Sequence, residues 1–79
     1  MTKLPKISGK EIINILIKKQ GFVVKRQKGS HVTLYKLHYD GTGLYVTVPI
    51  HGNKDLLPKT LFSILRQAKI EREELINLL

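Results

Sequence analysis

Two segments with helical spacing of apolar residues flank three short segments in which apolar and polar residues alternate. The first helical segment covers about residues 9–20, and the second begins at Pro58, which suits the first turn of a helix. Between them, residues 22–27, 32–37 and 44–49 are rich in Val, Thr, Tyr and Phe, as is typical of β-strands. This order of helix, three strands and helix predicts an α+β fold.

Turns that contain glycine separate the three expected strands. Residues 28–30 and 40–43 both supply glycine for a positive φ angle, so the simplest topology is an antiparallel sheet of two hairpins. Side chains alternate along a strand, and both helices need an apolar surface to cover, so we expect the helices on one face of the sheet. The covered face should hold Val32, Leu34, Val46 and Val48, and the open face His31, Thr33, Tyr35, Tyr45 and Thr47.

The ends of the helices carry recognisable signals. Ser8 and Glu11 have the spacing of a capping box, and Gly21 stands where a helix commonly ends in a left-handed residue. A short amphipathic piece over residues 73–79 closes the chain. With 79 residues there is room for one small core, so we predict a single domain over residues 1–79.

Composition excludes several classes of function. The chain has no cysteine, which excludes disulfides, thiolate zinc sites and cysteine nucleophiles. Its three histidines match no common zinc spacing, and no cluster of carboxylates suits magnesium, so we predict neither a metal site nor a cofactor. The apolar run Ile12–Ile17 is broken by Asn14 and is too short for a signal peptide or a membrane span, so we expect a cytoplasmic protein with no membrane partner.

The chain is strongly basic, with a formal net charge of +8. Residues 1–70 hold thirteen of the fourteen basic residues and three of the six acids, which gives this part a net charge of +10. Such a charge attracts nucleic acid or anionic membranes. Charge alone does not separate a nucleic-acid partner from a merely soluble basic protein.

The segment from Lys25 to His31 is the most informative one for chemistry. It places an imidazole at the start of a strand, directly after a tight turn and beside three cations, which suits proton transfer at a phosphodiester. Ser30 is discounted as a nucleophile activated by His31, because adjacent strand residues point to opposite faces. A lone histidine in a strand is also often merely packed or solvated, so the residues alone leave catalysis by His31 open.

Further candidate contacts with a nucleic acid lie outside that segment. Lys54 and Lys59 surround the start of the second helix, where backbone N–H groups also favour anions. Tyr35 and Tyr45 offer flat rings on which unpaired bases could stack, although these tyrosines could equally cover the sheet or contact a protein partner. The residues predicted to bind a nucleic acid are Lys25, Arg26, Lys28, Gly29, Ser30, Tyr35, Lys54 and Lys59.

An ordered set of short motifs resembles the HicA toxins of bacterial and archaeal HicAB toxin-antitoxin systems. No single motif is specific, but together they cover nearly the whole chain in order and with compatible spacing. The motifs are residues 6–11, Gly21-Phe22, residues 28–31 with the sequence Lys-Gly-Ser-His, residues 46–51, residues 57–61 and residues 64–68.

This resemblance implies a fold and a function. Such toxins are small mRNA interferases with an α-β-β-β-α fold similar to the double-stranded-RNA-binding domain. Their catalytic histidine lies in the Gly-Ser-His stretch, which here is His31. A HicB-type antitoxin covers the active site and forms a hetero-oligomer with the toxin. Glu71 departs from the family pattern, which often has a helix-capping serine there, so we expect a less stable start of the last helix.

The function that the resemblance implies is metal-independent cleavage of single-stranded RNA, with His31 as general acid and base. Lys28, Tyr35, His51 or water could protonate the leaving group, and the sequence does not rank them. Two other classes of function stay open. One is a non-catalytic RNA-binding module, and the other is a basic interaction protein that pairs with an acidic partner.

Overall fold

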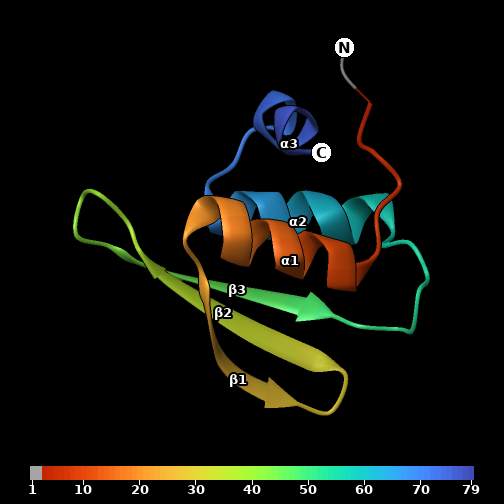
Figure 1. The fold of residues 1–79 in the computed structure, drawn as a ribbon, viewed down its shortest axis with the longest axis horizontal. Helices are drawn as coiled ribbons and strands as arrows, with labels where there is room; N and C mark the ends of the chain where they lie inside the picture. The colour runs from red at the N-terminus through yellow and green to blue at the C-terminus, as the bar shows by residue number, and fades with distance from the viewer. Residues whose placement is uncertain (1–2) are drawn as a thin grey trace.

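The computed structural model describes residues 3–79, which form three helices and one three-stranded sheet. The strands are antiparallel in the order β1-β2-β3, and α1 and α2 cover one face of the sheet, with α3 beyond them (Figure 1). The predicted α+β fold, with both long helices on one face, is confirmed. The elements are α1 (Gly9–Gln20), β1 (Val23–Lys28), β2 (His31–Leu37), β3 (Gly43–Pro49), α2 (Pro58–Ala68) and α3 (Arg72–Leu78).

The predicted signals at both ends of α1 are confirmed. The Ser8 hydroxyl accepts the Glu11 N–H at 3.2 Å, and the Glu11 carboxylate accepts the Ser8 N–H at 3.1 Å, which completes a capping box. Gly21 ends the helix with a left-handed φ of 78°, a conformation that favours glycine. The N–H groups of Gly21 and Phe22 then both donate to the Leu16 carbonyl. The chain is thereby turned from α1 into the sheet.

The strands confirm the predicted division of faces, but four of the predicted limits shift by one residue, namely the starts of all three strands and the end of the first. Val32, Leu34, Val46 and Val48 are buried under the helices. The first strand begins at Val23 rather than Phe22, because the Phe22 N–H donates to the Leu16 carbonyl in the turn that ends α1. The second begins at His31, which already pairs with Lys28 and Pro49.

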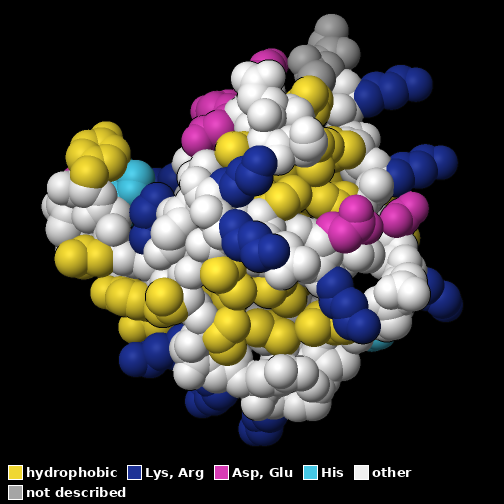
Figure 2. Space-filling model, in the orientation of Figure 1, with side chains coloured by type: hydrophobic (Ala, Val, Ile, Leu, Met, Phe, Trp, Pro, Cys, Tyr) yellow, Lys and Arg dark blue, Asp and Glu magenta, His cyan; other side chains and the backbone are white. Residues whose placement is uncertain are grey.

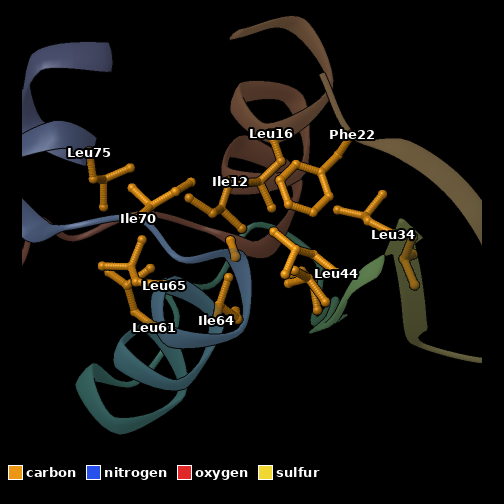
Figure 3. Packing of buried hydrophobic residues seen from close by; sticks show 14 of the residues in the cluster. Ile12, Leu16, Phe22, Leu34, Leu44, Leu61, Ile64, Leu65, Ile70 and Leu75 are labelled. Carbon is orange, nitrogen blue, oxygen red and sulfur yellow. The ribbon is translucent and has the colours of Figure 1, made fainter. Parts of the chain in front are cut away.

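The core lies between the helices and the sheet and reaches α3. Figure 3 shows Phe22 beside Leu16 and Leu34, and Leu75 of α3 beside Ile70. At the N-cap of α3, Glu71 makes no side-chain hydrogen bond to the helix, as its departure from the family pattern led us to expect. The helix nevertheless forms, and Leu75 is fully buried, so apolar packing holds α3 in place of a cap.

The two edges of the sheet are treated differently. At β3 the Thr47 N–H donates to Gln67 Oε1 of α2 at 3.1 Å, so a helix covers this edge. At β1 all six residues are exposed, and a bulge at Lys25 interrupts the pairing with β2. Bulges and lysines protect an open edge from pairing with other chains. The β1 edge therefore stays available to solvent.

The hairpin between β2 and β3 extends beyond the helices (Figure 1). Its turn is held by Asp40, whose carboxylate accepts the Thr42 N–H at 2.9 Å. Hydrogen bonds from the backbone and hydroxyl of Thr42 lower the pKa of this carboxyl. Tyr39 at the tip is 93% exposed, with its ring 4.3 Å from that of His38.

Among the helices of residues 3–79, none has the length and apolar character needed to cross a bilayer.

Candidate functional site

The sheet face that points away from the helices is the candidate site, and we call it the outer face. None of the three strands contains an aspartate or glutamate, so this face carries no strand carboxylate. Figure 2 shows Lys and Arg side chains projecting at the lower edge of the view, where Figure 1 places β1 and β2. The outer face is thus basic, whereas the visible acidic side chains lie nearer the helices.

His31 stands at one end of the outer face and is exposed. It is the first residue of β2, with Lys28 paired to it on β1 and Pro49 on β3. Gly29, with a φ of 60°, makes the turn that precedes it, and the Ser30 carbonyl accepts the Ile50 N–H at 2.6 Å. The backbone around His31 is therefore fixed from both neighbouring strands.

The imidazole of His31 is held by no neighbouring side chain. Within residues 3–79 it makes no hydrogen bond and no ion pair. An exposed ring without an internal partner can turn toward a ligand on the outer face. The arrangement also fixes no second acid or base against His31.

The cations predicted on β1 share the outer face with His31. Lys28 lies directly across the strand pair from it, and Arg26 pairs with Thr33, two residues further along β2. Lys25 is the extra residue of the bulge, and its ammonium lies 5.9 Å from the centroid of the Tyr35 ring. The structure therefore brings three predicted cations, His31 and Tyr35 together on one surface.

The second predicted basic element lies beside the outer face. Lys54 lines a pocket of about 530 Å³ together with His51 and Pro49, the residue that pairs with His31. Asp55 lines the same pocket and offsets part of its positive charge. Lys59 is exposed in the first turn of α2 but does not line the pocket. This element adjoins the His31 end of the sheet without merging with the β1 cations.

Two features of the surroundings were not part of the predicted RNA-binding set. His51 lines the pocket with Lys54, and its position two residues after β3 was the only signal for it. Tyr45 lies against Tyr35, with ring centroids 4.9 Å apart. Its place on the open face was predicted by alternation, but its contact with Tyr35 depends on the register between β2 and β3.

In residues 3–79, no three side chains of His, Asp or Glu are grouped so that they could hold a metal ion. The groups that the outer face offers to a ligand are one imidazole, lysine and arginine cations, hydroxyls and aromatic rings.

Comparison with known protein families identifies the family of this chain. The sequence model of the family described as HicA toxin of bacterial toxin-antitoxin matches residues 9–70, which run from the start of α1 to just beyond α2. A comparison with curated proteins gives no match. The match covers the candidate site and confirms the resemblance drawn from the motifs. This chain therefore belongs to the HicA toxin family, whose members are the toxins of bacterial toxin-antitoxin systems.

Proposed function

We propose that this toxin is a metal-independent endoribonuclease that cleaves single-stranded RNA, with His31 as general acid and base. The observation that carries the proposal is the position of His31. It is exposed at the end of a face without strand carboxylates, and Lys28 lies directly across from it. A phosphodiester bound there would meet a proton-transfer group and a cation at the same point.

The proposed reaction uses the 2′-hydroxyl of the RNA as nucleophile. His31 takes the 2′ proton, the 2′-oxygen bonds to phosphorus, and the bond from phosphorus to the 5′-oxygen breaks. Tyr35 lies four residues from His31 along β2, about 13 Å away, which is too far for it to protonate the leaving group. The products are a 2′,3′-cyclic phosphate and a 5′-hydroxyl, whose oxygen gains a proton from Lys28, His51 or water. Of these, Lys28 is the one paired with His31 in the sheet.

The cations of β1 have a second role in this proposal. Lys28 and Arg26 stabilise the negative charge that builds up on the phosphoryl oxygens as the new bond forms. The turn at Gly29 and Ser30 has no bulky side chain, so a phosphate can approach its backbone closely. Lys25 and Tyr35 then contact the RNA further along the sheet, and Lys54 and Lys59 bind RNA phosphates beyond the His31 end of the sheet.

The family assignment implies an antitoxin partner and an RNA target in general. We propose that the partner is a HicB-type antitoxin, which covers the outer face in a hetero-oligomer, and that the toxin acts on mRNA in the cytoplasm. The chain's net charge of +8 favours an acidic partner surface. A non-catalytic RNA-binding module and a basic interaction protein are the alternatives that the experiment below separates.

The test is incubation of the purified toxin with a labelled single-stranded RNA in EDTA, beside DNA of the same sequence. We expect RNA to be cut and DNA to stay intact, because only RNA has the 2′-hydroxyl. Mass spectrometry should find 2′,3′-cyclic phosphate ends. RNA that is bound but never cut would favour the binding module, and no effect on RNA before a partner is added would favour the interaction protein.

The phosphate contacts can be tested separately by the salt dependence of binding. In a His31→Ala background, which keeps the RNA intact, we expect Lys28→Ala to weaken binding to single-stranded RNA. The slope of log K against log salt should become shallower by about 0.7, the value for one lost phosphate contact. Lys18→Ala, an exposed lysine on α1, is the matched control and should leave the slope unchanged. Equal changes in both variants would mean that overall charge holds the RNA.

A further inference from the structure

An aromatic pair occupies the end of the outer face that is remote from His31. Tyr35 and Tyr45 pair across β2 and β3, with ring centroids 4.9 Å apart and planes tilted by 54°. Tyr45 is 55% exposed, although it lies in the middle of a strand. The pair therefore presents aromatic surface to solvent instead of burying it.

The neighbouring residues hold the Tyr35 ring in place. Gly43 pairs with Leu37 at the end of β3, and a Cβ at Gly43 would lie only 3.0 Å from Cε1 of Tyr35. Because glycine has no Cβ, Gly43 leaves space for the Tyr35 ring. The Lys25 ammonium approaches the same ring, with 5.9 Å to its centroid. Tyr35 is consequently braced, half-buried and flanked by a cation, while Tyr45 offers the more exposed ring.

Small side chains lie between the aromatic pair and His31 along β2 and β3. Thr33 and Thr47 pair with each other at the middle of β2 and β3, on the same face. Their small side chains separate the Tyr35 and Tyr45 rings from His31 and Pro49. An extended ligand that follows β2 and β3 would cross these threonines, beside Arg26 of β1, on its way between His31 and the aromatic pair.

The length of this path sets a scale in nucleotides. Tyr35 lies four residues beyond His31 on β2, a separation of about 13 Å along a strand. A stacked strand advances about 3.4 Å per nucleotide, and an extended one advances further. A base on the aromatic pair is therefore separated from the phosphate at His31 by about two to four nucleotides.

We infer that Tyr35 and Tyr45 form a base-binding subsite that holds an unpaired base two to four nucleotides from the cleaved bond. The inference rests on the proposed function and adds to it the part of the substrate that sets the position of cleavage. A nucleic acid suits this surface better than an acidic protein segment does, because aromatic rings stack on any base while Lys25, beside them, binds its phosphate. Docking of a protein is an outcome of the test.

The experiment uses a short DNA strand with one ribonucleotide, so that cleavage can occur at only one bond. Single abasic sites are placed at each position on both sides of that bond. For the wild-type toxin, we expect kcat/KM to fall about 5- to 140-fold at one position two to four nucleotides away, as loss of one base stacked on an aromatic ring implies. Abasic sites at other distant positions should have little effect.

The tyrosine variants connect that loss to the subsite. Tyr45→Ala should slow cleavage of the intact strand by a similar factor, and the abasic site should then cost nothing more. Tyr45→Phe keeps the ring and should behave as the wild type. Tyr39→Ala removes an exposed tyrosine from the hairpin tip and serves as the matched control.

The outcomes separate the inference from the proposed function. Cleavage that is insensitive to every abasic site, or an abasic penalty that persists in Tyr45→Ala, overturns the subsite. If neither the wild type nor any variant cuts any strand, the proposed function fails. Binding of the abasic series to the wild-type toxin then still tests the subsite, because a single abasic site two to four nucleotides from the ribonucleotide should weaken binding. If Tyr45→Ala leaves cleavage unchanged and weakens only binding to a HicB-type antitoxin, the pair is a protein contact and the inference is wrong.

Discussion

Replacing His31 with alanine should lower the rate of RNA cleavage about 10²- to 10⁴-fold, the usual contribution of a positioned acid or base. Among the residues of the three strands, His31 is the only histidine, and the variant removes its imidazole. Its side chain is exposed and makes no hydrogen bond within residues 3–79, so the fold should not change. Initial rates on labelled RNA measure the loss, and a thermal melt checks the fold.

Two further measurements distinguish a catalytic loss from a binding loss. The affinity of His31→Ala for RNA should stay near that of the wild type, because the β1 cations remain. Added imidazole should restore part of the cleavage by supplying the missing base in solution. His38→Ala changes a histidine on the hairpin between β2 and β3, beside Tyr39, and should cut RNA normally. Wild-type rates in His31→Ala would remove the residue from the mechanism.

Much of the fold could be predicted because its periodicities change sharply. The spacing of apolar residues separates α1 and α2 from the strands, and alternation alone assigned Val32 and His31 to opposite faces. The strand limits were less accurate. Phe22 is of a residue type common in strands, but its N–H belongs to the turn that ends α1. Nothing local marks Lys25 as the site of a bulge.

The candidate site also has a part that the sequence predicted and a part that it did not. Lys28, Gly29 and His31 are neighbours in the chain, so a tight turn was enough to predict that they would meet. The contact of Tyr35 with Tyr45 depends on how two strands pair, and the pocket of His51 and Lys54 depends on how the chain folds between β3 and α2. Such contacts follow from the register of the sheet and from the path between β3 and α2, which short-range patterns do not specify.

One close approach links the fold to the site. Gly9, the first residue of α1, packs against the end of β3, where an added Cβ would clash with the carbonyl oxygen of Pro49. Pro49 pairs with His31, and the next residue, Ile50, donates its N–H to the Ser30 carbonyl. Only glycine allows α1 to meet this backbone at such a short distance, so the helix supports the strand end that carries His31.

Gly9→Ala should therefore destabilise the protein, although glycine to alanine in a helix usually stabilises it by about 0.5 to 1 kcal/mol. The methyl group would meet rigid backbone, so we expect a loss of about 3 kcal/mol in the free energy of unfolding, the upper part of the range for overpacking. For a domain of this size, that lowers Tm by about 12 to 24 °C.

Calorimetry of Gly9→Ala beside Asn14→Ala tests this expectation, since Asn14 is exposed on the same helix and has no such neighbour. Asn14→Ala should leave Tm unchanged or raise it slightly, because alanine is the better helix former. At temperatures where Gly9→Ala is still folded, its rate of RNA cleavage should also be lower than that of the wild type, because the displaced end of β3 moves the strand beside His31. A higher Tm in Gly9→Ala would mean that α1 and β3 are further apart, and that His31 is held by the sheet alone.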